Sequence, residues 1–186
     1  MDYSSQNIQA RKLYSGFTLI ELLITLAVAS ILLTVAVPGF SGFFQDNLLR
    51  TQIQSLHTAI AFARDEAVRR GVSVSVCGST PNQAGCDGSW HNGWLVFTDP
   101  DENGVLDAGD SRLRVWEGIE PNRLIYSNVL SYVGFDSQGF LQQRQDNRDL
   151  AGTFMLCDDR GAPEARGIQI SSNGRSRMAP GGIVCP

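Results

Sequence analysis

Histidine is scarce in this chain of 186 residues, which contains only His57 and His91. The sequence shows no cysteine–histidine arrangement for nucleophilic catalysis and no glycine-rich loop for binding phosphates. Asp101 and Glu102 supply carboxylates, but no matched acid–base pair accompanies them. These absences argue against an enzyme and favour a structural or interaction protein.

Excess positive charge is also absent, because the formal net charge is −4. The first sixteen residues carry Arg11, Lys12 and Asp2, so the remainder is near −5. Such a surface does not attract nucleic acid as a whole. No internal repeat or low-complexity linker interrupts the chain, which suits one domain after residue 37.

One long apolar run is present, over residues 17–37, and Glu21 is its only charged residue. As a helix the run is ~32 Å long, which matches the hydrocarbon core of a bilayer. The hydroxyls of Thr25, Ser30 and Thr34 are tolerated there because they bond back to helix carbonyls. Positive charge at residues 11 and 12 predicts that the N-terminus stays in the cytoplasm. A charge inside hydrocarbon costs several kcal/mol, so Glu21 needs a functional reason.

The small residue Gly16 precedes the apolar run, whereas an ordinary secretory signal is cut after its apolar core. The sequence from Gly16 to Glu21 resembles the class III signal of type IV pilins and type II secretion pseudopilins. The resemblance implies that a prepilin peptidase cuts between Gly16 and Phe17 and that Phe17 is N-methylated. It also implies that Glu21 pairs with the N-terminal amine of a neighbouring subunit. The alternative is a simple transmembrane anchor, which has no use for Glu21.

Beyond the run, an apolar residue recurs every three or four positions up to Arg70, which predicts one stripe of an amphipathic helix. The stripe consists of Leu49, Ile53, Leu56, Ile60, Ala63 and Ala67. Pro38 and Gly39 allow a kink at its start, and Gly71 is the expected C-cap. Strands are predicted at residues 72–77, 94–98, 112–117, 123–126, 132–135, 153–157 and 168–171, separated by turn-forming residues.

This order predicts an α+β fold of the type IV pilin kind, with a long N-terminal helix packed on an antiparallel sheet. The first half of that helix is expected to lie in the membrane. The expected organisation is a cleaved leader over residues 1–16, a membrane and assembly helix over 17–37, an amphipathic helix over 38–70 and a β-rich head over 71–186. We expect a single-pass inner-membrane protein with a periplasmic head, which later enters a filament.

Four cysteines are present, and an even number in a translocated domain suggests two disulfides. We favour Cys77–Cys86, which closes a short loop, and Cys157–Cys185, which pins the C-terminal segment to a strand. The longer closure stabilises by ~3–4 kcal/mol in the chain-entropy model. Other pairings are compatible with the sequence. Zinc is disfavoured, because no two cysteines have the spacing of a zinc knuckle.

Three segments of the head resemble minor pilins of the GspH/FimT/FimU group. They are the helix end at residues 63–70 with the strand after it, residues 93–99 and residues 170–177. By resemblance, these subunits lie at or near a filament tip, with other pilins or pseudopilins as partners. Three roles follow: DNA binding in natural transformation, priming or tip formation without DNA, and service as the minor pseudopilin H of type II secretion.

The DNA hypothesis rests on Gly174-Arg175-Ser176-Arg177, which matches the Gly-Arg-x-Arg tail motif of FimT-like pilins. In an extended segment Arg175 and Arg177 share one face and lie ~6.6 Å apart. Guanidinium groups bind phosphate bidentately, and Gly174 adds little bulk where a ligand backbone approaches. Arg166 adds charge, and no acidic residue follows Glu164. Two phosphate contacts predict a salt slope near −1.8. The alternative is a solvated basic turn that closes the sheet.

A second candidate site begins at Asp99 and follows the spacing of a calcium-binding loop, with a glycine at the sixth position. Its candidate side-chain ligands are Asp99, Asp101, Asn103, Asp107 and Asp110. The twelfth residue is Asp rather than the usual Glu, and strands rather than helices flank the loop. We favour the alternative, a polar hairpin loop held by Asx turns with no cofactor.

Overall fold

The computed structural model describes residues 16–118, 123–126, 131–142, 151–161, 165–179 and 185; the side chains of 35–39 and 123–126 are not described. The chain divides into two units, Met1–Phe43 and Phe44–Pro186. We call the second the head unit. The leader with Arg11 and Lys12 lies outside the described residues, apart from Gly16.

Helix α1 covers Leu19–Arg70 without interruption, so the helix continues through the position at which a kink was allowed. Its apolar stripe from Leu49 to Ala67 is buried, as the three-to-four-residue spacing predicts. Gly71 ends the helix: it has φ +66°, and its N–H donates to the Ala67 carbonyl at 2.9 Å. This is the left-handed C-cap expected from the sequence.

The described residues of the head unit form two four-stranded antiparallel sheets beside α1. The first has the order β3-β2-β1-β5, and the second has the order β4-β6-β7-β8. The strands are β1 Val74–Gly78, β2 Gly93–Thr98, β3 Arg112–Glu117, β4 Arg123–Tyr126, β5 Tyr132–Phe135, β6 Gly152–Cys157, β7 Arg166–Ile170 and β8 Ser176–Met178. A short 3-10 helix, η1 Trp90–Asn92, precedes β2. The α+β class expected from the sequence is thereby confirmed.

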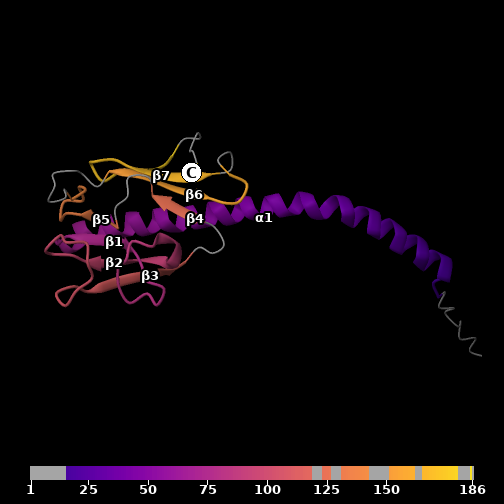
Figure 1. Ribbon diagram of the computed structural model, residues 1–186, viewed down its shortest axis with the longest axis horizontal. Coiled ribbons are helices and arrows are strands. Elements are labelled where there is room, and N and C mark those ends of the chain that lie inside the picture. Colours follow the sequence, from indigo (N-terminus) through magenta and orange to yellow (C-terminus); the bar gives the residue numbers. More distant parts are fainter. Residues whose placement is uncertain are drawn as a thin grey trace, which may run out of the picture. The chain divides into compact units, whose positions relative to one another are not determined.

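The main core of the head unit joins the buried stripe of α1 to side chains of both sheets, including Val74, Trp94, Phe135, Phe154 and Ile168. Figure 1 shows β1 and β2 along one side of α1 and β6 and β7 along the other. Trp90 and Trp94 are 4% and 1% exposed, so these two rings belong to the core and are not available to stack on bases.

A second, smaller apolar cluster lies on the opposite face of β1 and β2 and contains Cys77, Leu95 and Phe97. The Cys77–Cys86 loop and Leu106 cover it. Strand β1 is therefore buried on both faces. Ser75 is fully buried on it and is satisfied by donating to the Asp99 carboxylate. The acidic loop is thus joined to the core by a hydrogen bond that the sequence did not reveal.

Candidate functional site

The residues around the processing site lie at the start of α1. Phe17 is 84% exposed, and Gly16 is exposed beside it. Thr18 and Glu21 form a reciprocal pair: the Glu21 N–H donates to Thr18 Oγ1 at 3.3 Å, and the Thr18 N–H donates to Glu21 Oε2 at 3.4 Å. This is the geometry of a capping box, which satisfies two free donors at a helix N-terminus. Glu21 therefore has a local structural contact that the sequence interpretation missed, although the Thr-x-x-Glu pattern was available to reveal it.

The hydroxyl groups of the apolar run behave as the sequence interpretation required. Thr25, Ser30 and Thr34 each donate to the carbonyl three residues earlier, at 2.7–2.8 Å. Over the described part of the chain, no helix is both long and apolar enough to cross a membrane. The side chains of residues 35–37, at the end of the predicted membrane segment, lie outside that part.

The basic segment near the C-terminus is a tight turn followed by strand β8. Within the turn, Gly174 N–H donates to the Ser171 carbonyl at 2.8 Å, and Ser171 N–H donates to the Arg175 carbonyl at 3.0 Å. The Arg175 N–H also donates to Asn173 Oδ1 at 3.2 Å. Only Ser176–Met178 form the strand. The expectation of one extended segment is therefore wrong for Arg175, because the turn before β8 already includes it.

Gly174 is buried and serves the packing of the protein itself. Its φ is +76°, and an added Cβ would lie 2.3 Å from the carbonyl oxygen of Gly139. That same oxygen accepts a hydrogen bond from Arg64 Nε at 2.8 Å. The expectation that Gly174 leaves space for a ligand backbone is wrong, because the loop before Leu141 fills that space. The sequence could not show this, since Gly139 and Gly174 meet only in the folded state.

The three candidate arginines occupy different positions in the second sheet. Arg175 is exposed on the turn, and no hydrogen bond of its guanidinium is found among the described residues. Arg177 is exposed on β8, and its Nε and Nη2 donate to Gln169 Oε1 at 3.0 and 2.7 Å. Arg166 begins β7 and donates to the Ala165 carbonyl at 3.1 Å. The oxygen that Arg177 contacts belongs to a neutral amide, so its hydrogen bonds leave the charge of the guanidinium in place. Arg166, in contrast, interacts electrostatically with the Asp158 carboxylate.

Two residues of α1 contact this basic turn and were not assigned to it from the sequence. His57 Nε2 lies 3.4 Å from the Ser176 carbonyl oxygen. Arg64 Nη2 lies 3.5 Å from the carbonyl oxygen of Asn173. His57, Arg64, Gly174 and Arg175 line a cavity of about 220 Å³. The only signal in the sequence was the seven-residue spacing, which places His57 and Arg64 on one face of the helix.

Both expected disulfides are present. Cys77–Cys86 has its Cα atoms 5.7 Å apart, and Cys157–Cys185 has them 6.2 Å apart. Both distances lie within the range for unstrained bridges. The second bridge joins β6 to the C-terminal segment that follows β8.

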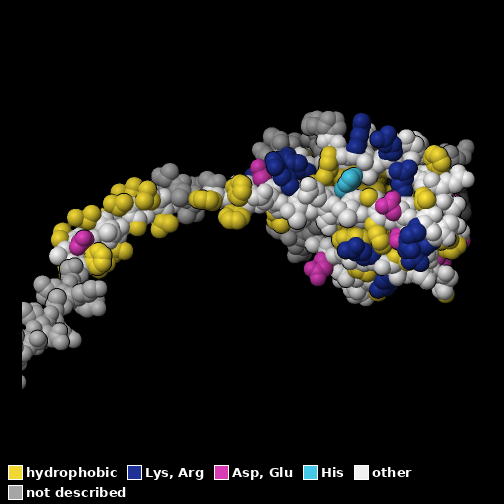
Figure 2. All heavy atoms as spheres, turned by 180° about the vertical axis from the view of Figure 1, so that it is seen from behind, with side chains coloured by type: hydrophobic (Ala, Val, Ile, Leu, Met, Phe, Trp, Pro, Cys, Tyr) yellow, Lys and Arg dark blue, Asp and Glu magenta, His cyan; other side chains and the backbone are white. Residues whose placement is uncertain are grey.

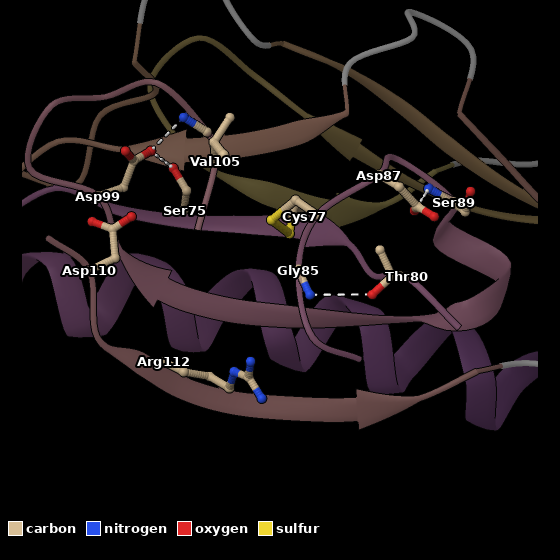
Figure 3. Close-up of a disulfide and its surroundings, with 12 residues drawn as sticks. Ser75, Cys77, Thr80, Gly85, Asp87, Ser89, Asp99, Val105, Asp110 and Arg112 are labelled. Atoms are coloured by element: carbon tan, nitrogen blue, oxygen red, sulfur yellow. Dashed lines mark hydrogen bonds between the residues drawn. A yellow bond between two sulfur atoms is a disulfide. The ribbon is translucent and has the colours of Figure 1, made fainter. Parts of the chain in front are cut away.

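The acidic loop is organised around a buried carboxylate. Asp99 is fully buried and accepts the backbone N–H groups of Asn103 and Gly104 at 3.0 and 3.1 Å, besides the Ser75 hydroxyl. Burial raises the pKa of Asp99 above its ordinary value, although these three hydrogen bonds oppose the rise. Figure 3 shows Asp110 facing Asp99 beside the disulfide. Burial also raises the pKa of Asp110.

The five candidate calcium ligands are only partly brought together. One carboxylate oxygen each from Asp99, Asp101 and Asp110 lies within 4.8 Å of the others. Asn103 instead accepts the Val105 N–H through Oδ1 at 2.6 Å, while its Nδ2 donates to Asp101 and Asp107 at 2.7 and 3.1 Å. The loop thus satisfies much of its own polar surface through Asx turns. This arrangement fits the hairpin interpretation better than a preformed calcium cage.

Comparison with known families assigns the chain. A family model described as type II transport protein GspH matches residues 52–174, and a model of the prokaryotic N-terminal methylation motif matches residues 11–37. The first match covers more than half of the chain. The chain belongs to the GspH family. It is therefore a pilin- or pseudopilin-type structural subunit and not an enzyme.

Solved structures agree with this GspH-family fold. Two crystal forms of the type IV minor pilin FimU from Pseudomonas aeruginosa are similar to this chain, with TM-scores of 0.55 and 0.54 at 23% and 22% sequence identity. The alignments cover 74% and 71% of this chain and 92% and 93% of FimU. No match was found among curated protein sequences.

Proposed function

We propose that this GspH-family protein is a minor pilin of a type IV pilus system that binds DNA through its C-terminal arginines. In this proposal a prepilin peptidase cuts between Gly16 and Phe17 and methylates Phe17. Residues 17–37 hold the protein in the inner membrane, with residues 38–70 and the β-rich head at 71–186 on the periplasmic side. Glu21 then pairs with the amine of a neighbouring pilin during assembly into the filament or its tip.

The observation that carries the DNA proposal is the exposure of Arg175 and Arg177 on a turn and strand that contain no carboxylate. No acidic residue follows Glu164 in the sequence, so the region after it is positive on an otherwise acidic chain. The turn also holds Arg175 outward, because the backbone on both sides of it is hydrogen-bonded. Preorganised, exposed guanidinium groups bind phosphate oxygens favourably.

A titration of the purified full-length chain in detergent with duplex DNA tests this proposal. The matched variant is Arg175→Ala/Arg177→Ala, which removes both guanidinium groups and leaves Gly174 in place. We expect the wild type to bind DNA in a salt-sensitive manner and the variant to bind more weakly. Equal binding by both proteins would refute the DNA role.

A pseudopilin of a type II secretion system is the second candidate function, because the matching family model describes a type II transport protein. Deletion of the gene separates the two machines when transformation, piliation and protein secretion are scored independently. Loss of transformation with normal secretion supports the proposal. Loss of secretion alone supports the pseudopilin, and loss of piliation without loss of transformation supports a priming or tip subunit that does not bind DNA.

A further inference from the structure

Helix α1 presents a line of mostly polar and basic side chains to strand β8. Its polar and basic members are Arg50, Gln54, His57 and Arg64, and the small residue Ala61 lies between the last two. Their spacings of four and three residues place them on one face of the helix. This face lies next to the buried apolar stripe of α1, since Ile53 and Ile60 of the stripe line the same two surface hollows.

Two hollows follow one another along this face. The first, of about 340 Å³, lies between Arg50 and Gln54 of α1 and Arg166 and Met178 of the sheet. The second is the cavity of about 220 Å³ between Arg64 and the turn at Arg175. Residue numbers increase along α1 in the direction in which they decrease along β8. The helix and the strand therefore run antiparallel along a common boundary. We call this boundary, from Arg50 to Arg64 on α1 and from Ala179 to Gly174 on the sheet, the α1–β8 groove.

His57 follows the first hollow along α1 and is the first helix residue that lines the second. Its Nε2 approaches the Ser176 carbonyl oxygen at 3.4 Å, and it lines the second hollow. From Arg50 to Arg64 the groove is ~21 Å long at the helical rise of ~1.5 Å per residue. That length accommodates several consecutive phosphates of a nucleic-acid strand.

Positive charge dominates the groove. Four arginines line it, and Asp65 is the one carboxylate among its described lining residues. Arg64 is bonded to carbonyl oxygens, which leave its charge in place, while Arg50 is exposed. Figure 2 shows a face of the head unit on which basic side chains gather with fewer acidic ones among them. The concentration of cations contrasts with the net charge of −4 for the chain.

We infer that the α1–β8 groove is a track for a DNA phosphodiester backbone, in which Arg50 and Arg64 of α1 extend the site formed by the C-terminal arginines. The inference rests on the proposed DNA role and enlarges its site. Arginine and a polar helix face contact phosphates without reading bases, so the track is sequence-independent. Contact is made along one strand of the duplex.

The number of phosphates contacted distinguishes this track from the smaller site. At ~0.9 per phosphate on duplex DNA, contacts by Arg175 and Arg177 alone predict a slope of log affinity against log salt near −1.8. Contacts by the four arginines that line the groove predict a slope near −3.6. The two sites therefore differ in a quantity that is independent of absolute affinity.

The test measures this slope for the full-length chain in detergent with a short mixed-sequence duplex over a range of sodium chloride concentrations. Arg50→Gln removes one exposed cation from the groove, and Gln54→Arg adds one beside it. We expect Arg50→Gln to make the slope shallower by ~0.9 and Gln54→Arg to make it steeper by a similar amount. Partial unfolding of a variant would not make the slope steeper, so a steeper slope for Gln54→Arg reports an added phosphate contact.

Arg112→Gln is the matched control, because it removes the same charge from β3 of the other sheet, where Arg112 is exposed and donates to the Ala84 carbonyl at 3.2 Å. Its slope is expected to equal that of the wild type. A wild-type slope near −1.8, unchanged by either groove variant, would overturn the track while leaving the proposed DNA role standing. An equal effect of Arg112→Gln and Arg50→Gln would also overturn it, since general surface charge would then be responsible. Absence of DNA binding by the wild type would remove the proposed function and the track together.

Discussion

Replacing Gly174 by alanine tests whether this residue serves the fold or the ligand. The residue has φ +76°, a conformation in which a Cβ costs about 1–2 kcal/mol. The new Cβ would also lie 2.3 Å from the Gly139 carbonyl oxygen. Backbone must move to relieve that overlap, and overpacking of this kind adds typically 1–3 kcal/mol.

The two effects together predict that Gly174→Ala lowers the free energy of unfolding by roughly 2–5 kcal/mol. At about 2–4 °C per kcal/mol for a domain of this size, the melting temperature falls by roughly 4–20 °C. Moving the Gly139 carbonyl also weakens its hydrogen bond from Arg64 Nε, so the contact between α1 and the loop at Gly139 is weakened as well.

Gly71→Ala supplies the matched control. Gly71 has φ +66°, but an added Cβ there meets nothing within 4 Å. This variant therefore carries the conformational cost of about 1–2 kcal/mol without the overlap. Arg175→Ala is the complementary control, because its exposed side chain adds little to stability but serves DNA binding in our proposal.

Urea unfolding of the oxidised chain, followed by circular dichroism, gives the three stabilities. We expect Gly174→Ala to be less stable than Gly71→Ala by at least ~1 kcal/mol and Arg175→Ala to match the wild type. If Gly174→Ala and Gly71→Ala lie within ~0.5 kcal/mol of each other, the packing argument for Gly174 is refuted.

Three further predictions concern other sites. Glu21→Gln keeps an acceptor for the Thr18 N–H but removes the charge. We expect this variant, like Glu21→Ala, to insert into the membrane normally yet fail to enter filaments. Normal incorporation of the Gln variant would assign Glu21 to capping alone. Calorimetry should show no heat when calcium is added and no change in melting temperature, because the loop around Asp99 is hydrogen-bonded internally; a saturable heat with a raised melting temperature would contradict this. Hydrogen bonds from Arg69 and Arg70 lower the pKa of Glu66 below its ordinary 4.5. The ionised Glu66 carboxylate therefore stabilises the folded state above pH 4.5, and this stabilisation disappears as the pH falls through the folded-state pKa. Glu66→Gln should therefore be less stable than the wild type by about 1 kcal/mol near neutral pH and equally stable in strong acid, and a difference that persists in acid would count against the ion pair.

Patterns between near neighbours in the sequence predicted most of the fold. The stripe from Leu49 to Ala67 and the C-cap at Gly71 were predicted because side-chain spacing and backbone preference act within a few residues. Seven of the eight strands described were predicted in the same way, with ends shifted by one or two residues at β1, β2, β6 and β7. Strand β8 was missed as a strand, since three residues rich in serine and arginine carry no strand signal of their own.

Two local contacts were missed although the sequence contains their signals. The capping box of Thr18 and Glu21 follows a known four-residue pattern. The Glu66 carboxylate precedes Arg69 and Arg70 at helical spacings of three and four, which favour the observed ion pairs. Both contacts join residues only three or four positions apart, so each could have been predicted from the sequence.

The sequence by itself determined the N-terminal methylation motif, the order of helix and strands, and the cysteines available for pairing. Only the tertiary structure decided that Gly174 is enclosed by Gly139 and that Arg177 is held by Gln169. It also decided that Arg50 lies beside residues of β7 and β8 and that Arg64 lies beside the turn before β8, more than a hundred residues later in the chain. Spacing along a helix fixes which residues share a face. What that face meets depends on the packing of α1 against two sheets, and no local pattern encodes that arrangement.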